Sequence, residues 1–215
     1  MRTEWIPLSA AALVTGVMAL VLGALLNPLM ESASPAQTLQ VATHSGGRWL
    51  AMAVFYFVGS VALTLGMPTL LSLFNRRGRT LGMLRVAVFA IGIVGMAGFA
   101  MLMVFYRALV VHHAVKGDAM DEVVKDAGLT TFLYAWVGGF LLGILLIAIA
   151  LFRARKTPVW VPVLLLVFLG LTPVASMLGQ AGSAVQLMAM SAAFTGVATT
   201  ASSPEHRAEL ARDSA

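Results

Sequence analysis

The feature that most constrains this chain is its series of long uncharged segments. Charged residues are absent from residues 5–30, 49–75, 86–106, 127–152 and 157–204. A helix needs about 20 apolar residues to cross the hydrocarbon core of a bilayer, so each segment can hold at least one span. Only 11% of the residues are charged, against about 25% in soluble domains. The sequence therefore excludes a water-soluble enzyme and a nucleic-acid-binding domain.

These segments predict an all-α, polytopic transmembrane helical bundle that forms a single domain over residues 1–201. As one helix, the segment 157–204 would be about 70 Å long at about 1.5 Å per residue, more than twice the core thickness of about 30 Å. We therefore divide it near Pro173 and Gly179–Ser183. The expected six spans are at about 5–27, 48–74, 82–106, 130–152, 159–178 and 184–200.

The last span is the least apolar, because it carries four polar side chains: Gln186, Ser191, Thr195 and Thr199. A five-span alternative places residues 184–200 at the membrane surface. Elsewhere we expect a polar connection from the first span to Gly47, and a short polar cytoplasmic tail at 202–215.

The distribution of basic residues predicts the orientation of the bundle. If the spans alternate, one side of the membrane holds ten basic residues and the other holds four. The richer side contains Arg2, Arg76, Arg77, Arg79, Arg85, Arg153, Arg155, Lys156, Arg207 and Arg212. Because basic residues concentrate on the cytoplasmic side, we expect the N-terminus and both arginine clusters to be cytoplasmic.

Three segments resemble a group of small multi-pass bacterial membrane proteins of about six spans that are common in high-GC Gram-positive genomes. They are His44–Leu50, Arg76–Arg79 and Arg153–Trp160. The resemblance implies a helical architecture and a bacterial plasma membrane. It implies no activity and no functional residue, because none is established for that group.

Small residues recur at helical spacing in three of the spans. They are Ala12, Gly16, Ala19 and Gly23 in the first span, Gly92, Gly95 and Gly98 in the third, and Gly139 and Gly143 in the fourth. In lipid, such faces let helix backbones approach closely. We interpret them as helix-packing positions, either within one bundle or against a partner protein or a second copy.

Few residues could carry chemistry. The spans contain no carboxylate and the chain contains no cysteine. The sequence also lacks a nucleophile elbow, a P-loop, a dinucleotide fingerprint and a zinc-protease motif. We therefore expect no enzymatic activity and no cofactor. The missing intramembrane carboxylates argue against a carboxylate proton relay, since transporters retain such costly groups for function.

One candidate polar site lies on the side opposite the arginine clusters. It consists of His44, His112, His113, Asp121 and Glu122, and imidazoles with carboxylates can bind a divalent metal. Adjacent histidines, however, point about 100° apart on a helix, and no His-x-x-x-His spacing is present. We therefore expect no metal at this site.

The acidic residues of this region have a simpler interpretation as part of a surface helix within 108–128. Asp118 suits its N-cap and Gly128 its C′ position. Met120 and Val123 contribute to one apolar face, which would let the helix lie on the membrane surface.

The expected function is that of a non-enzymatic multi-pass membrane protein acting through helix packing, as an accessory or assembly subunit or as a membrane sensor. The alternative is a small carrier or lipid-handling protein with a mid-membrane cavity near Pro68, Thr172 and Pro173. The expected contacts are the lipid bilayer and a membrane-protein partner or second copy, without nucleic acid.

Overall fold

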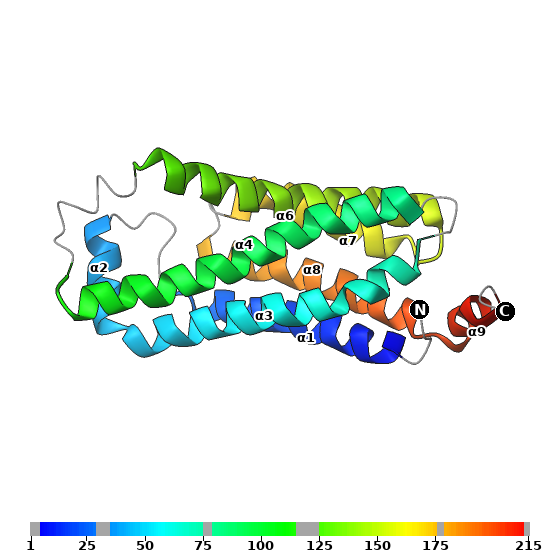
Figure 1. Cartoon of the computed structure of the whole chain (residues 1–215), viewed down its shortest axis with the longest axis horizontal. Coiled ribbons are helices and arrows are strands. Elements are labelled where there is room, and N and C mark those ends of the chain that lie inside the picture. Colours follow the sequence, from blue (N-terminus) through cyan, green and yellow to red (C-terminus); the bar gives the residue numbers. More distant parts are fainter. Residues whose placement is uncertain (1–4, 29–34, 75–78, 115–124, 176–178, 213–215) are drawn as a thin grey trace.

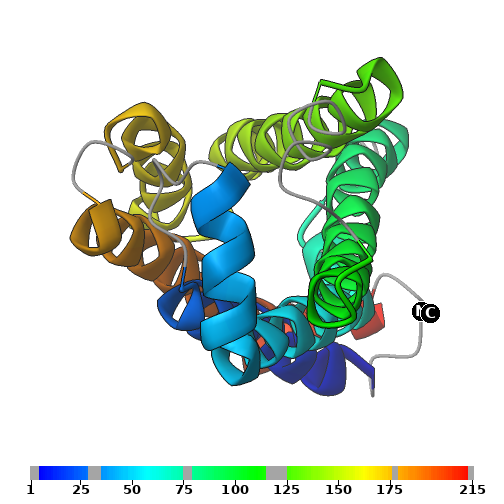
Figure 2. The same ribbon diagram turned by 90° about the vertical axis from the view of Figure 1, so that its left-hand side faces the viewer.

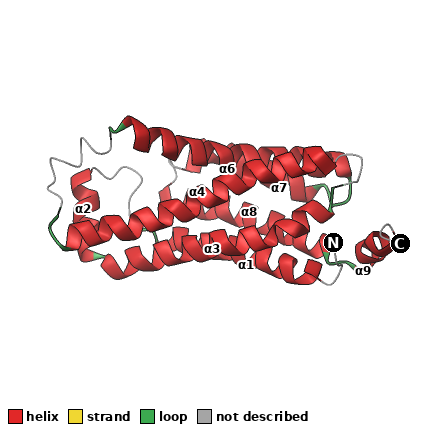
Figure 3. Ribbon diagram, in the orientation of Figure 1, coloured by secondary structure: helices red, strands yellow, loops and turns green. Residues whose placement is uncertain are grey.

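The computed structural model describes the chain except for residues 1–4, 29–34, 75–78, 115–124, 176–178 and 213–215. The described residues are almost entirely helical, and none of them forms a strand (Figure 3). The helices are α1 (Ile6–Leu26), α2 (Pro35–His44), α3 (Gly46–Ser72), α4 (Arg79–Val111), α6 (Ala127–Ala154), α7 (Trp160–Ala175), α8 (Gly179–Ala201) and α9 (Pro204–Arg212). The expected all-α helical bundle is confirmed.

Five of the described helices are long and apolar enough to cross a membrane. They are α1, α3, α6, the Gly82–Val111 part of α4 and the Gly182–Ala201 part of α8. α7 is also apolar but has 16 residues, which gives it a length of about 24 Å. The helix that the five-span alternative placed at the surface, α8, is thus among those that can cross. The chain is a multi-pass membrane protein.

Six helices form a closed ring in the order α1, α3, α4, α6, α7 and α8, and α8 returns to contact α1. Figure 2 looks into this ring from one end, where α2 crosses the opening. The ring neighbours α1 and α3 are antiparallel, since Gly66 meets Leu13 whereas Tyr56 meets Gly23. The chain ends marked in Figure 1 lie at one end of the bundle, where α1 begins and α3, α6 and α8 end. We call this the basic end, because α6 ends there with Arg153 and Arg155 and α9 carries Arg207 and Arg212.

A row of four buried phenylalanines connects the helices across the ring. The ring centroids of Phe89 and Phe194 are 5.8 Å apart, and those of Phe89 and Phe140 are 5.6 Å apart, both in stacked geometry. Phe140 in turn meets the edge of Phe168 at 6.4 Å. These side chains come from α4, α8, α6 and α7, so three consecutive ring contacts join four of the six ring helices.

A smaller cluster at the end opposite the basic end explains why α2 forms where a polar connection was expected. Ala42 of α2 is fully buried against Trp49, Met52 and Val110. The Trp49 indole donates its Nε1 hydrogen bond to the Met103 carbonyl at 2.9 Å. This cluster therefore ties α2 to the beginning of α3 and the end of α4.

The boundaries around the expected surface helix also differ from the sequence prediction. α4 continues to Val111 and α6 begins at Ala127, so Gly128 lies inside α6 and does not end a surface helix. The Asp126 carboxylate caps α6 by accepting the N–H of Leu129 at 2.8 Å, which satisfies a donor of the first turn. The stretch 115–124 lies outside the described residues.

One expectation near the C-terminus is corrected, and the expected tail is found to contain a helix. The Gly179–Ser183 stretch begins α8 and is not a turn; residues 176–178, which separate α7 from α8, lie outside the described residues. In the tail, Pro204 opens α9, and the Ser203 hydroxyl accepts the N–H of His206 at 3.3 Å. A serine cap followed by proline is a favourable helix start, and it converts most of the expected tail into a helix.

Candidate functional site

The candidate site lies beside a close contact between α1 and α3. A Cβ atom added at Gly16 would lie 2.7 Å from the Leu63 backbone nitrogen, and one added at Gly66 would lie 2.7 Å from Leu13 Cα. A Cβ at Gly59 would lie 3.0 Å from the Gly16 carbonyl oxygen. Only glycine fits at these positions, because the obstacles are backbone atoms. The two helix backbones are therefore in direct contact along much of their length.

Toward the basic end, this contact finishes in a buried hydrogen bond. The Ser9 hydroxyl donates to the Ile6 carbonyl at 3.1 Å, and its oxygen lies 2.6 Å from Thr69 Oγ1. Since a hydroxyl has a single proton, the Thr69 hydroxyl donates to Ser9 in this arrangement. Both side chains are buried, so the bond fixes the register of α1 against α3.

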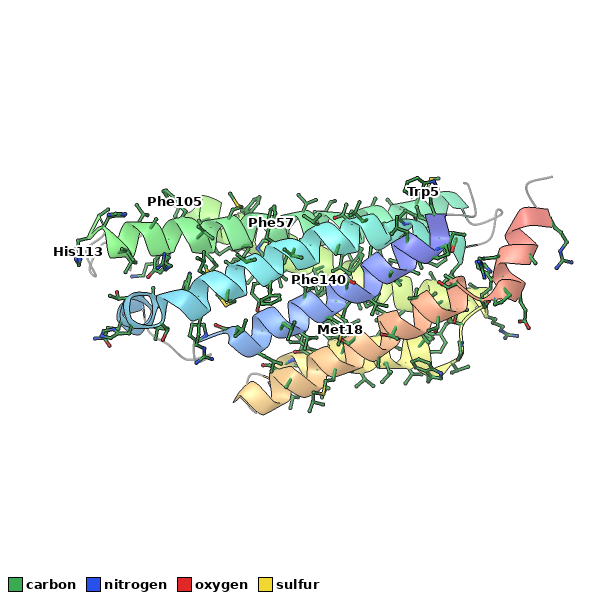
Figure 4. The ribbon with its side chains drawn as sticks, turned by 90° about the horizontal axis from the view of Figure 1, so that it is seen from below. Trp5, Met18, Phe57, Phe105, His113 and Phe140 are labelled. Atoms are coloured by element: carbon green, nitrogen blue, oxygen red, sulfur yellow. The ribbon has the colours of Figure 1, made fainter. Side chains whose placement is uncertain are left out.

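Beside this bond, the two helices enclose a groove of about 510 Å³. It is lined by Trp5, Ile6, Leu8, Ser9, Ala12, Thr64, Leu65 and Pro68. Trp5 and Leu65 are 62% and 63% exposed, so the groove faces outward from the ring. Figure 4 shows Trp5 at the start of α1, near the basic end of the bundle. Its volume falls within the range of about 300–1,000 Å³ that is typical of ligand pockets.

The α3 wall of the groove is apolar because its hydroxyl groups bond to their own helix. Thr64 Oγ1 donates to the Ser60 carbonyl at 2.9 Å, and Ser60 Oγ donates to the Tyr56 carbonyl at 2.8 Å. Pro68 has no N–H, so the Thr64 carbonyl cannot accept the usual backbone hydrogen bond from position 68. On the opposite wall, the small side chain of Ala12 leaves the space open.

One end of the groove coincides with the N-terminus of α1. Trp5 stands at the N-cap position without a side-chain capping bond, and the described first turn contains a proline and no acidic residue. The first N–H groups of a helix have no partner within it and carry partial positive charge. The groove thus combines an apolar body with a weakly positive end.

The other predicted small-residue positions lie mostly inside the bundle. Ala19 is buried, and Ala12 lines the groove. A Cβ added at Gly23 would lie 2.7 Å from the ring of Tyr56. α3 therefore covers the surface of α1 at both Gly16 and Gly23.

The glycines of α4 and α6 differ among themselves. A Cβ at Gly92 would lie 2.5 Å from the Phe140 nitrogen, one at Gly95 2.7 Å from Trp136 Cγ, and one at Gly143 2.5 Å from Phe89 Cα. At Gly139 the nearest atom would be 3.5 Å away, an ordinary contact. Gly98 has no neighbour within 4 Å of an added Cβ and is exposed. It therefore lies outside the helix contact that its spacing suggested.

The expected cavity near Pro68, Thr172 and Pro173 does not form as one site. Pro68 lies on α3 in the groove, whereas Thr172 and Pro173 lie on α7, and the described parts of α3 and α7 are not in contact. Thr172 serves the α7–α8 contact, because Gln186 Nε2 donates to its hydroxyl at 2.8 Å and to the Phe168 carbonyl at 3.1 Å.

The candidate outer polar residues are only partly described. His44 is exposed and donates its Nδ1 hydrogen bond to the Gln40 carbonyl at 2.9 Å. His112 and His113 are exposed at the end of α4, whereas Asp121 and Glu122 lie outside the described residues. Within the part of the chain that the structure describes, no three metal-ligating side chains gather.

Sequence reasoning missed most residues of the groove and half of the glycine contact. Gly59 and Gly66 are seven residues apart, as are Gly16 and Gly23. The matching spacing would have marked α1 and α3 as two glycine-rich contact faces, although only Gly16 and Gly59 meet each other, because Gly23 lies against Tyr56 and Gly66 against Leu13. Trp5, Thr64 and Leu65 gave no comparable signal, because each is ordinary for a residue in or near a membrane span.

Comparison with known proteins adds no assignment at this point: no family model, no curated protein and no solved structure matches this chain.

Proposed function

We propose that this protein is a non-enzymatic, multi-pass membrane protein that holds a membrane lipid in the groove between α1 and α3. The observation that carries the proposal is the groove itself, an outward-facing apolar space of about 510 Å³ on a membrane-spanning surface. Ligand sites of this size characteristically have apolar walls and few polar groups. The lipid-handling alternative from the sequence is thus preferred, at a different place from the one expected.

The small-residue positions that suggested an accessory or assembly subunit pack mostly against helices of the same chain. Gly16, Gly92 and Gly143 are all occupied by neighbouring helices of the same chain. A partner helix would need a different surface, because these positions have no room for it. The α1–α3 groove, which no side chain of this protein fills, supports a binding function better than these packed positions do.

The physical reason for lipid specificity lies in shape and not in hydrophobicity. Moving an acyl chain from the bilayer into an apolar groove exchanges one apolar environment for another, so association in lipid depends on close packing and polar contacts. A lipid seated between Ala12 and Pro68 would gain packing against two rigid helices.

The test is to fill the groove and count retained lipid. The protein, purified in mild detergent, is incubated with an equimolar mixture of dioleoylphosphatidylglycerol and dioleoylphosphatidylcholine, and lipid adducts are counted by native mass spectrometry. In Ala12→Leu, an isopropyl group is added inside the groove. Ala11→Leu is the matched control, because Ala11 is exposed and does not line the groove.

We expect one lipid to be retained by the natural protein and by Ala11→Leu, and to be lost from Ala12→Leu. Equal retention by the two variants would show that the groove does not hold the lipid. Thermal stability is measured in parallel, so that a folding defect in Ala12→Leu is recognised. In that case Ala12→Val, which adds two methyl groups at the same position in the groove, takes its place and should also lose the lipid.

A further inference from the structure

We infer that the groove takes an anionic phospholipid, with an acyl chain between α1 and α3 and the phosphate at the basic end. This inference rests on the proposed function and adds to it the chemical class of the lipid. It follows from the position of the groove relative to the charges of the bundle.

The groove reaches the end of the bundle and is not confined to its middle. Its lining on α1 starts at Trp5 and Ile6, where that helix begins. On α3 it extends to Pro68, one turn before the helix ends at Ser72. A lipid with its acyl chain in the groove would therefore place its headgroup at the basic end.

The charges at this end are predominantly positive. The described residues there include the exposed side chains Arg153, Arg155, Arg207 and Arg212, together with Lys156. The acidic side chain described at this end is Glu205. α9, which carries Arg207, lies near the start of α1 in both Figure 1 and Figure 2. Basic residues near a membrane surface attract anionic lipids.

The N-terminus of α1 adds a second attraction for phosphate. Its first turn has no side-chain cap and no acidic residue among the described residues. Unsatisfied backbone donors are costly next to hydrocarbon, and helix N-termini are suited to binding phosphate oxygens. A phosphate at the mouth of the groove would accept hydrogen bonds from these donors.

Headgroup charge is the property that would distinguish one lipid from another here. Two phospholipids with identical acyl chains fill the apolar groove equally well, so the groove walls do not separate them. The basic end favours the lipid with net negative charge, and salt should weaken that preference because exposed charges are screened.

The experiment uses the same equimolar lipid mixture and compares two double variants. Arg207→Gln with Arg212→Gln removes two exposed charges of α9 at the basic end, and Arg48→Gln with Lys125→Gln removes two exposed charges at the opposite end. The natural protein should retain phosphatidylglycerol over phosphatidylcholine by at least about fivefold. The basic-end variant should lose most of that preference, whereas the opposite-end variant should keep it.

The outcomes separate this inference from the proposed function. Equal retention of both lipids, still abolished by Ala12→Leu, would overturn the anionic preference and leave lipid holding intact. A preference lost only in the opposite-end variant would also overturn the inference, because it would place the headgroup at the other end. Lipid retention that ignores Ala12→Leu would overturn the proposed function itself. If the protein formed dimers without lipid adducts, and if Ala12→Leu dissociated those dimers, a second copy of the chain would occupy the groove. That result would overturn both the proposed function and this inference.

Discussion

The two glycines of the GxxxG pair in α6 should respond oppositely to the same substitution. A Cβ at Gly143 would lie 2.5 Å from Phe89 Cα and 2.8 Å from its nitrogen, whereas ordinary contacts begin at 3.4 Å. Because these are backbone atoms, α4 would have to retreat from α6 by roughly 0.9 Å. At Gly139 the nearest atom is already 3.5 Å away, so a methyl group fits without movement.

These distances set the expected magnitudes. Overpacking a tight interior costs about 1–3 kcal/mol, while replacing glycine by alanine within a helix gains up to about 1 kcal/mol. Gly143→Ala should therefore lower the free energy of unfolding by about 1 kcal/mol, and Gly139→Ala should raise it by up to about 1 kcal/mol. For a chain of this length, the resulting difference of about 2 kcal/mol corresponds to about 4–8 °C in Tm.

The assay is thermal unfolding of both variants in the same detergent, followed by loss of the monodisperse peak in size-exclusion chromatography. The two variants form a matched pair, since the chemical change and the helix are identical. Gly98→Ala, at an exposed position with no neighbour within 4 Å, supplies the propensity effect alone. If Gly143→Ala proved as stable as Gly139→Ala, the close approach of α4 and α6 at Phe89 would be refuted.

Three further predictions concern topology, a strained cap and a buried hydrogen bond. In this cysteine-free chain, single cysteines should react with an impermeant thiol reagent from the cytoplasm at Gly78 and Ser214, and from outside at Ser34 and Ala119. External labelling at position 214 would contradict the six-span topology and leave the five-span alternative. Arg155 ends α6 in the left-handed region with φ 51°, so Arg155→Gly should raise the free energy of unfolding by about 1 kcal/mol. Arg153→Gly, inside the helix, should lower the free energy of unfolding by about 1 kcal/mol. The reverse order of the two variants in thermal unfolding would contradict the left-handed conformation of Arg155. A double-mutant cycle of Ser9→Ala and Thr69→Val should give a coupling of about 0.6–1.7 kcal/mol in the free energy of unfolding. Additive effects of the two substitutions would contradict a hydrogen bond between these side chains.

The sequence alone was sufficient to predict the all-α bundle and the approximate positions of its helices. Transfer of an apolar segment into a bilayer depends mainly on the composition of that segment, so it can be read locally. The helix that was expected at 5–27 is observed at Ile6–Leu26, and that expected at 48–74 is observed at Gly46–Ser72. The departures occur at connections such as α2, where burial of Ala42 by residues far along the chain stabilises a helix.

Only the tertiary structure decided which faces of the helices meet and where the groove lies. In a soluble protein, the apolar face of a helix indicates the core, but in lipid both protein-facing and lipid-facing positions are apolar. Leu13 is fully buried while Leu8, on the same helix, is 62% exposed, and nothing in their residue type distinguishes them. For the same reason the sequence could mark Gly98 and Gly143 alike, although one faces open space and the other a neighbouring backbone. The groove between α1 and α3 follows from how Ala12, Thr64 and Pro68 are placed together, and that placement is a property of the packed bundle.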